Sequence, residues 1–155
     1  MNDSLKINGE NLFSYKDAVK AGVIEHGIRR ICELLYFMDA LPLSSCEGHL
    51  RKPGSKDYVG NPFVMFHSSV ETAKSINDAV VKKGKIDWML RGRFHDSLDI
   101  LVWTLRPAHS HCHSAHYSSE QLDNELKAVE VALEGCLTNV PGKCDITDEK
   151  VTISP

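Results

Sequence analysis

Apolar residues recur with the period of an α-helix in three stretches of the chain. We expect the first helix to run from Ser14 to about Ala40, because Pro42 disfavours helical backbone in the residues just before it. A serine followed three residues later by glutamate or glutamine is a capping box, and one opens each of the other two stretches, at Ser68 and Ser118. The expected buried faces are Ile24, Ile28, Ile31, Leu35 and Met38 in the first helix, Val70, Ala73, Ile76 and Val80 in the second, and Leu122, Leu126, Val129, Leu133 and Leu137 in the third.

Shorter apolar segments between these helices have the pattern of β-strands. The last two are expected to pair as a hairpin through residues 92–97, and the segment 98–105 is apolar on both faces, as in a central strand. A polar loop is expected at residues 51–57, and a weaker strand lies in the tail at residues 150–153. The expected strands of the main sheet are residues 43–50, 62–67, 85–91 and 98–105.

The order helix, strand, strand, helix, strand, strand, helix predicts an α+β fold, with an antiparallel or mixed sheet of about four strands and three helices. We expect a single domain at residues 14–138, between an N-terminal segment, 1–13, and a C-terminal tail, 139–155. If the helices shared one face of the sheet, the side bearing Leu101, Trp103 and Leu105 would be exposed. We therefore expect a homodimer or larger homo-oligomer with Trp103 near its interface.

Composition narrows the class of protein. The chain has 155 residues, of which 42% are hydrophobic and 25% charged, as in an ordinary soluble globular protein. Without a leader or a long apolar run, we expect a cytoplasmic protein that does not interact with membranes. A formal net charge of -3 excludes a global basic field, so we expect no extended nucleic-acid surface and only a local patch for any nucleotide. The five cysteines are widely spaced and are expected to be reduced thiols.

Six consecutive residues after the first helix combine two hydroxyls, a thiol, a carboxylate and an imidazole around a glycine. The glycine would let backbone N–H groups approach an anion, the hydroxyls would donate to it, and the carboxylate or imidazole could move a proton. The segment fits either a ligand-binding loop or a polar turn with a buried cysteine. Its residues are Ser44, Ser45, Cys46, Glu47, Gly48 and His49.

Arg91 and Arg93 share one face of an expected strand, beside Trp88 and Phe94. Guanidinium groups together with an aromatic ring suit a nucleotide. We therefore predict that the protein binds a nucleotide-like or other phosphorylated small molecule, by non-catalytic binding or sequestration. The predicted ligand-binding residues are Ser44, Ser45, Cys46, Glu47, Gly48, His49, His67, Arg91 and Arg93.

Histidines offer an alternative from a different class, a metal-dependent hydrolase in which Glu47, His49 and His67 hold a divalent metal ion that activates water. Three further imidazoles recur at every second residue within 109–113, so they would project from one side of an extended segment. Such a row cannot by itself close around one ion, and a surface loop is the other interpretation. The candidate metal ligands are His49, His67, His109, His111 and His113.

The sequence Ser-Ser-Cys-Glu-Gly-His at residues 44–49, between a helix rich in Ile and Leu and the strand at 62–67, resembles the tRNA wybutosine-synthesis methyltransferase family, which carries Ser-Ser-Cys-Ser-Gly-Arg. The similarity covers about residues 24–107. Glu47 stands where the family has Ser, and His49 stands where it has Arg. The resemblance implies a ligand-binding loop after the first helix. It also implies a further alternative, an S-adenosylmethionine-dependent enzyme that modifies tRNA.

Overall fold

Two antiparallel sheets and four helices form the described part of the chain, which is residues 4–7, 10–48, 61–83, 87–96, 98–108 and 119–138 of the computed structural model. The fold is α+β, as predicted from the order of the elements. Along the chain the elements are β1 (Ser4–Ile7), β2 (Glu10–Ser14), α1 (Tyr15–Ala21), α2 (His26–Phe37), β3 (Leu41–Cys46), β4 (Phe63–His67), α3 (Val70–Lys83), β5 (Trp88–Phe94), β6 (Leu101–Pro107) and α4 (Ser119–Thr138).

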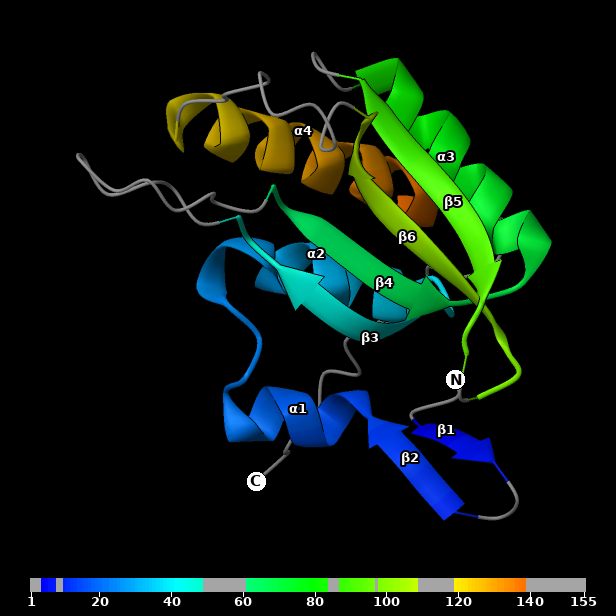
Figure 1. Cartoon of the computed structure of the whole chain (residues 1–155). Coiled ribbons are helices and arrows are strands. Elements are labelled where there is room, and N and C mark those ends of the chain that lie inside the picture. Colours follow the sequence, from blue (N-terminus) through cyan, green and yellow to red (C-terminus); the bar gives the residue numbers. More distant parts are fainter. Residues whose placement is uncertain are drawn as a thin grey trace, which may run out of the picture.

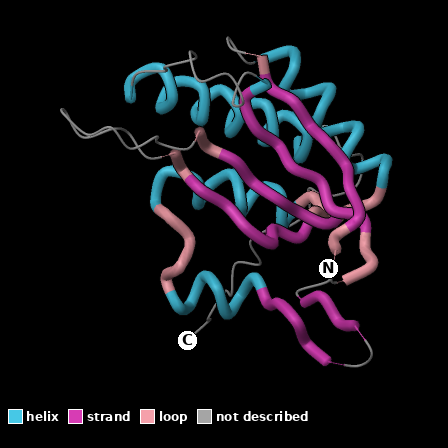
Figure 2. The backbone as a smooth tube through the Cα atoms, in the orientation of Figure 1, coloured by secondary structure: helices cyan, strands magenta, loops and turns pink. Residues whose placement is uncertain are grey.

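The main sheet has the strand order β3-β4-β6-β5, and each neighbouring pair is antiparallel. Helices α2, α3 and α4 all lie on the same face of this sheet (Figure 1). The opposite face carries no helix among the described residues, and α1 with the β1-β2 hairpin lies beyond the β3 edge (Figure 2). The domain therefore has one layer of helices and one layer of sheet.

The helix expected at residues 14–40 is two helices, so the described residues form four helices and not three. Ser14 caps the first of them, as predicted, by accepting a hydrogen bond from the N–H of Asp17. Gly22 ends it in the left-handed conformation, with φ 68 and ψ 23, and its N–H bonds to the carbonyls of Ala18 and Val19. Glycine adopts this conformation without a steric penalty, and it is the usual residue at a helix C-terminus.

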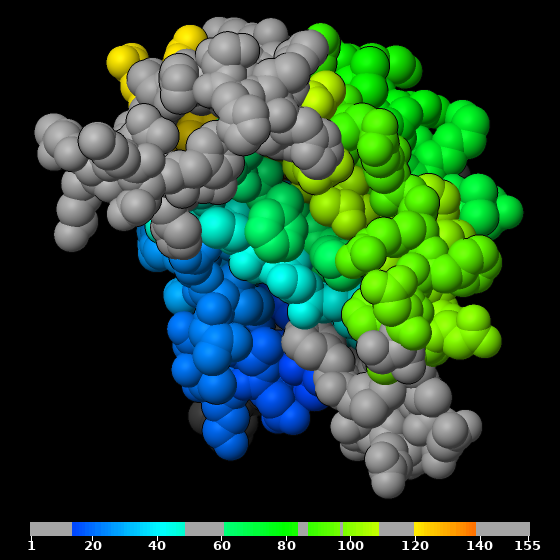
Figure 3. Space-filling model, viewed as in Figure 1, coloured from blue at the N-terminus to red at the C-terminus, as the bar shows by residue number. Residues whose placement is uncertain are grey.

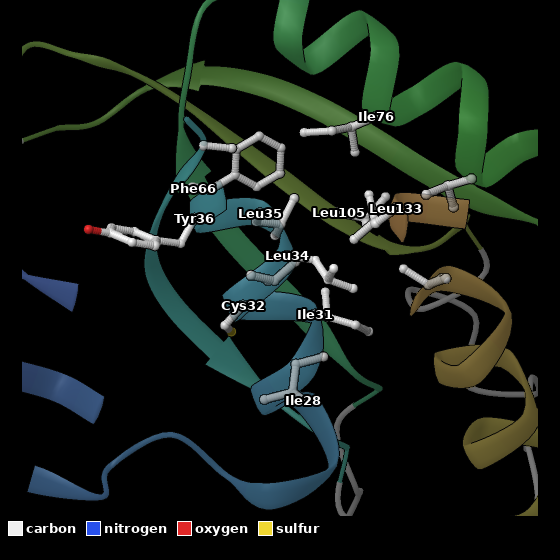
Figure 4. Packing of buried hydrophobic residues seen from close by; sticks show 14 of the residues in the cluster. Ile28, Ile31, Cys32, Leu34, Leu35, Tyr36, Phe66, Ile76, Leu105 and Leu133 are labelled. Carbon is white, nitrogen blue, oxygen red and sulfur yellow. The ribbon is translucent and has the colours of Figure 1, made fainter. Parts of the chain in front are cut away.

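The hydrophobic core lies between the helices and the sheet (Figure 4). Phe66 of β4 points toward Leu35 of α2 and Ile76 of α3, and Leu105 of β6 meets Leu133 of α4. None of these five side chains is more than 1% exposed. Of the inner faces predicted from the apolar spacing, α3 buries Ala73, Ile76 and Val80, and α4 buries Leu122, Leu126, Val129 and Leu133. Val70, the first residue of α3, was expected in this face but is 58% exposed. The cap bond of α3 comes from Ser69, which accepts from the N–H of Thr72, and not from Ser68.

Strand β6 corrects one expectation about self-association. Leu105 is 1% exposed, and Trp103 packs against the core and donates from its indole N–H to the carbonyl of Ser68 at 3.3 Å. This side of the strand faces the helices, so it is not the exposed face of a monomer. The argument for an oligomer with an interface at Trp103 therefore fails, although an oligomer itself stays a prediction.

Other boundaries differ from the expected ones by a few residues. Strand β3 begins at Leu41 and includes Pro42, which an edge strand tolerates because its missing N–H breaks no interior ladder. The hairpin strands begin three residues later than expected, at Trp88 and Leu101. The segment before Ser14 forms β1 and β2, which the sequence pattern did not indicate. The expected loop at 51–57 and strand at 150–153 lie outside the described residues. In the described part of the chain, every helix is too short or too polar to cross a membrane.

Candidate functional site

The antiparallel register places one row of side chains across all four strands of the main sheet. Ser44 of β3 is opposite Met65 of β4, Met65 is opposite Thr104 of β6, and Thr104 is opposite Arg91 of β5. Directly opposed residues of an antiparallel pair point to the same face. Two residues that lie far apart in the sequence, Ser44 and Arg91, therefore share one sheet face.

The buried residues of β5 show which face this is. Trp88 is buried and donates from its indole N–H to the Glu125 carboxylate of α4 at 3.1 Å, and Leu90 packs on the same core. Alternate residues of a strand point to opposite faces. Arg91 and Arg93 therefore point away from the helices, and both are exposed. In the register of the sheet, Arg93 is opposite the buried Val102.

We call this surface the open face. Alternation from the paired positions assigns to it both polar and apolar residues, and one carboxylate, that of Asp87 just before β5. Figure 3 shows the surface of these strands between the segments drawn in grey. The open face consists of Ser44, Cys46, Phe63, Met65, His67, Asp87, Met89, Arg91, Arg93, Thr104 and Arg106. Val102 points to the same side by alternation but is fully buried.

His67 lies at the end of β4, and its ring orientation is fixed by a hydrogen bond. Its Nδ1 is 2.8 Å from the carbonyl oxygen of Leu101, and because a carbonyl only accepts, Nδ1 must donate. In the neutral ring Nε2 then carries the lone pair. His67 can therefore offer an acceptor at Nε2, or a second donor when the ring is protonated.

Ser45 points to the other side of β3. Its hydroxyl bonds to the buried thiol of Cys32 in α2. Burial raises the pKa of that thiol to about 11, and the bond from Ser45 acts in the opposite direction. Ser45 is therefore part of the contact between β3 and α2 and does not line the open face.

The side chain of Glu47 caps the N-terminus of α2. Its carboxylate accepts the N–H of Gly27 at 2.6 Å, and its own backbone N–H donates to the carboxylate of Glu25 at 2.7 Å. The first N–H groups of a helix have no partner within the helix, and a negative charge there is favourable. Glu25, the N-cap residue, makes no side-chain cap bond of its own. Glu47 supplies this bond from the end of β3, which is a structural role that sequence reasoning missed.

Cys46 has the wrong electrostatic surroundings for a nucleophile. Burial raises the pKa of its thiol, the backbone N–H of Gly48 lowers it, and the carboxylate of Glu25 raises it again. A nucleophilic cysteine needs a lowered pKa, because the thiolate is the reactive form. Gly48, which follows, has φ 87, a conformation that glycine adopts easily.

The predicted metal ligands are not brought together by the described residues. Cys46 is opposite Phe63, whereas Leu41 is opposite His67, so Glu47 and His67 lie at opposite ends of the β3-β4 ladder. His67 is four residues, roughly 13 Å, from the position opposite Cys46, and Glu47 lies one residue further, so the two are too far apart for one ion. Within the described ranges no group of three His, Cys, Asp or Glu side chains could hold a metal ion. Four candidates, His49, His109, His111 and His113, lie outside those ranges.

Sequence reasoning also missed residues that share the open face with the arginines. Met65 and Thr104 lie in the same row as Arg91, and Phe63 and Arg106 share the face by alternation. The alternation of buried and half-buried residues in β4 is the signal that could have indicated its outer side. Which strands neighbour each other could not be read from that pattern.

Comparison with protein-family models, with curated proteins and with solved structures finds no match for this chain. The similarity of residues 44–49 to the wybutosine-synthesis methyltransferases therefore rests on the motif and the order of elements alone.

Proposed function

We propose that the protein binds a nucleotide or a similar phosphorylated small molecule on the open face, with its phosphates at Arg91 and Arg93. The observation that carries this proposal is the register, which puts both exposed guanidinium groups on the face that no described helix covers. Neither guanidinium forms an ion pair with a described residue in the structure. Guanidinium groups bind phosphate oxygens through paired, charge-assisted hydrogen bonds.

The spacing of the face fits such a ligand. Arg91 and Arg93 are two residues apart on one strand, about 7 Å between their Cα atoms, so their side chains can reach adjacent phosphates. His67 and Met65 lie two strands away, at about 10 Å, which leaves room for a sugar and base over the centre of the sheet. Among the described residues the open face carries three arginines, Arg91, Arg93 and Arg106, against the single carboxylate of Asp87, which favours an anion there despite the net charge of -3 on the chain.

Isothermal titration calorimetry with ADP at low ionic strength tests the proposal. We expect binding to the native protein, and a loss of at least tenfold in affinity in Arg91→Gln/Arg93→Gln, because hydrogen bonds to charged groups contribute about 1.5 to 3 kcal/mol each. The matched control is Lys82→Gln/Lys83→Gln, which removes two exposed charges from the end of α3. Adenosine, which has no phosphate, should bind both arginine forms equally.

Two results would contradict this proposal. One is the absence of ADP and pyrophosphate binding to the native protein, and the other is an equal loss of affinity in the lysine control. Tight binding of S-adenosylmethionine without ADP binding would favour the methyltransferase-like alternative, because that molecule carries no phosphate.

A further inference from the structure

At the outer edge of the main sheet, the backbone groups of β5 are paired with no described strand. The N–H of His95 donates to the carbonyl of Ile100 at 2.8 Å, and the N–H of Ala108 donates to the carbonyl of Asp87 at 2.7 Å. These bonds show that odd-numbered residues of β5 direct their backbone groups toward β6. The even-numbered residues, Trp88, Leu90, Gly92 and Phe94, therefore direct their N–H and C=O groups outward.

This edge lacks most of the features that keep sheet edges from pairing. Strand β5 has seven residues, contains no proline, and pairs with β6 without a bulge. Phe94 at its end is 69% exposed. β5 is the last strand in the sheet order, and no described strand pairs with its outer side. The edge is thus long and regular enough to accept another strand.

We propose that this edge pairs with β5 of a second copy of the chain, antiparallel and centred on Leu90, to form a symmetric dimer with a continuous sheet. Because only even-numbered residues direct their backbone groups outward, even-numbered residues of the two copies must lie opposite each other. A two-fold axis perpendicular to the sheet achieves this when it passes between the two copies of one residue, and not between two different residues. The choice among the possible centres follows from the charges on the open face.

Centring on Leu90 brings opposite charges together. Arg93 of each copy then lies opposite the exposed Asp87 of the other, and Arg91 lies opposite Met89. Centring on Arg91 would instead put the two copies of Arg91 opposite each other, and centring on Gly92 would oppose Arg91 and Arg93. Opposed like charges destabilise a sheet, whereas opposite charges stabilise it. Of these three arrangements only the first satisfies both the backbone groups and the charges. Centring on Met89 would oppose Arg91 and Asp87 but would leave Arg93 beyond the described end of the other copy's strand.

In this dimer the odd-numbered positions form non-hydrogen-bonded pairs, whose Cα atoms are about 4.5 Å apart. This distance is within the range that a disulfide spans. Met89→Cys/Arg91→Cys should therefore form a covalent dimer on mild oxidation, through Cys pairs between position 89 of one copy and position 91 of the other. The single variants should not, because in this register position 91 does not face itself.

Sedimentation equilibrium at micromolar concentration, with the full chain, is the first test. We expect a species of twice 17.3 kDa for the native protein. Arg93→Glu should weaken the dimer at least tenfold, and Asp87→Arg/Arg93→Glu should restore it, because the exchanged charges again oppose each other. Lys82→Glu, a charge reversal away from the edge, should have no effect.

The possible outcomes distinguish an error in the dimer itself from an error in its register. A native species of 17.3 kDa at every concentration overturns the dimer, and so does an Arg93→Glu dimer of native affinity. A covalent dimer from Arg91→Cys alone overturns the register centred on Leu90. Arg93 has a role in both proposals, but nucleotide binding has no part in these measurements, so a failure of this inference is distinguishable from a failure of the proposed function.

Discussion

Removing the carboxylate of Glu47 should destabilise the protein through the N-terminus of α2. The contact at stake is the 2.6 Å hydrogen bond from the N–H of Gly27, together with the favourable position of the charge at the helix end. Loss of a helix cap costs about 1 kcal/mol, and the lost charge adds about 0.5 kcal/mol. We therefore expect Glu47→Ala to lower the free energy of unfolding by about 1.5 kcal/mol.

The assay is urea unfolding followed by circular dichroism, with a matched control. Asp78→Ala removes an acidic group whose partner, Lys74, is exposed, and it should cost clearly less stability than Glu47→Ala. Glu47→Gln keeps a neutral acceptor and should lose less stability than Glu47→Ala. If Glu47→Ala costs no more than Asp78→Ala, or if Glu47→Gln and Glu47→Ala are equal, the capping role is refuted.

A second variant tests the same contact from the helix side. A Cβ at Gly27 would lie 2.7 Å from the Glu47 carboxylate oxygen, so Gly27→Ala must displace the carboxylate in the native protein. In the Glu47→Ala background only the Cβ of residue 47 remains, at 3.3 Å, a contact that a small shift relieves, and alanine is the better helix former by about 0.5 kcal/mol or more. The substitution should therefore destabilise the first protein and stabilise the second. Equal effects in both backgrounds would contradict the contact.

Three further outcomes follow from the packing. Burial raises the pKa of the Cys32 thiol from 9.0 to about 11, so its contribution to stability is complete below pH 9 and is lost as the pH rises toward 11. Between pH 8.5 and 10.5 the free energy of unfolding should fall by about 2 kcal/mol through this group, and less in Cys32→Ala, as denaturant titrations at each pH would show. Phe66→Ala should cost about 3 to 5 kcal/mol in urea unfolding, because Phe66 is fully buried at the centre of the core. Gly92→Ala should cost about 1 to 3 kcal/mol in thermal unfolding, because its Cβ would lie 2.8 Å from the ring of Trp103; an unchanged midpoint would contradict that contact.

The sequence predicted the helical layer better than the breaks within it. The spacing of Ile24, Ile28 and Ile31 is regular and all three residues are buried, although Ile24 lies before α2, so periodicity alone did not show that this helix begins only at His26. The end of α1 at Gly22 depends on one residue in the left-handed conformation. A glycine inside an apolar pattern is compatible with either a continuous or an ended helix, so tertiary packing decides between them.

The candidate site shows a similar division. Arg91 and Arg93 were correctly placed on one face of a strand, since that follows from alternation within seven residues. The aromatic partners expected beside them were wrong, because Trp88 is buried toward the helices and Phe94 alternates to the same side. That Ser44 lies in the same row depends on the strand order β3-β4-β6-β5 and on the register shift between Pro42 and Ser44. The residues close to Ser44 in the sequence indicate neither the strand order nor the register shift.

Glu47 was predicted to act on a ligand because polar groups cluster around it in the sequence. Its hydrogen-bonding partner Gly27 is 20 residues away and has no side chain, so no pattern of side chains could indicate the contact. Helix ends often take such a bond from a distant element, because their first N–H groups need some acceptor. A carboxylate near a strand end is thus ambiguous until the neighbouring helix is placed.

The central claim is that a phosphorylated ligand binds the open face of the sheet. Nuclear magnetic resonance with ¹⁵N-labelled protein tests it most directly, by following the arginine Nε–H signals while ADP is added. The account predicts that the signals of Arg91 and Arg93 shift in a saturable way, while that of Arg30, which is held by Glu33 and Glu134 at the helix layer, does not. Saturable binding that leaves Arg91 and Arg93 unshifted would contradict the account.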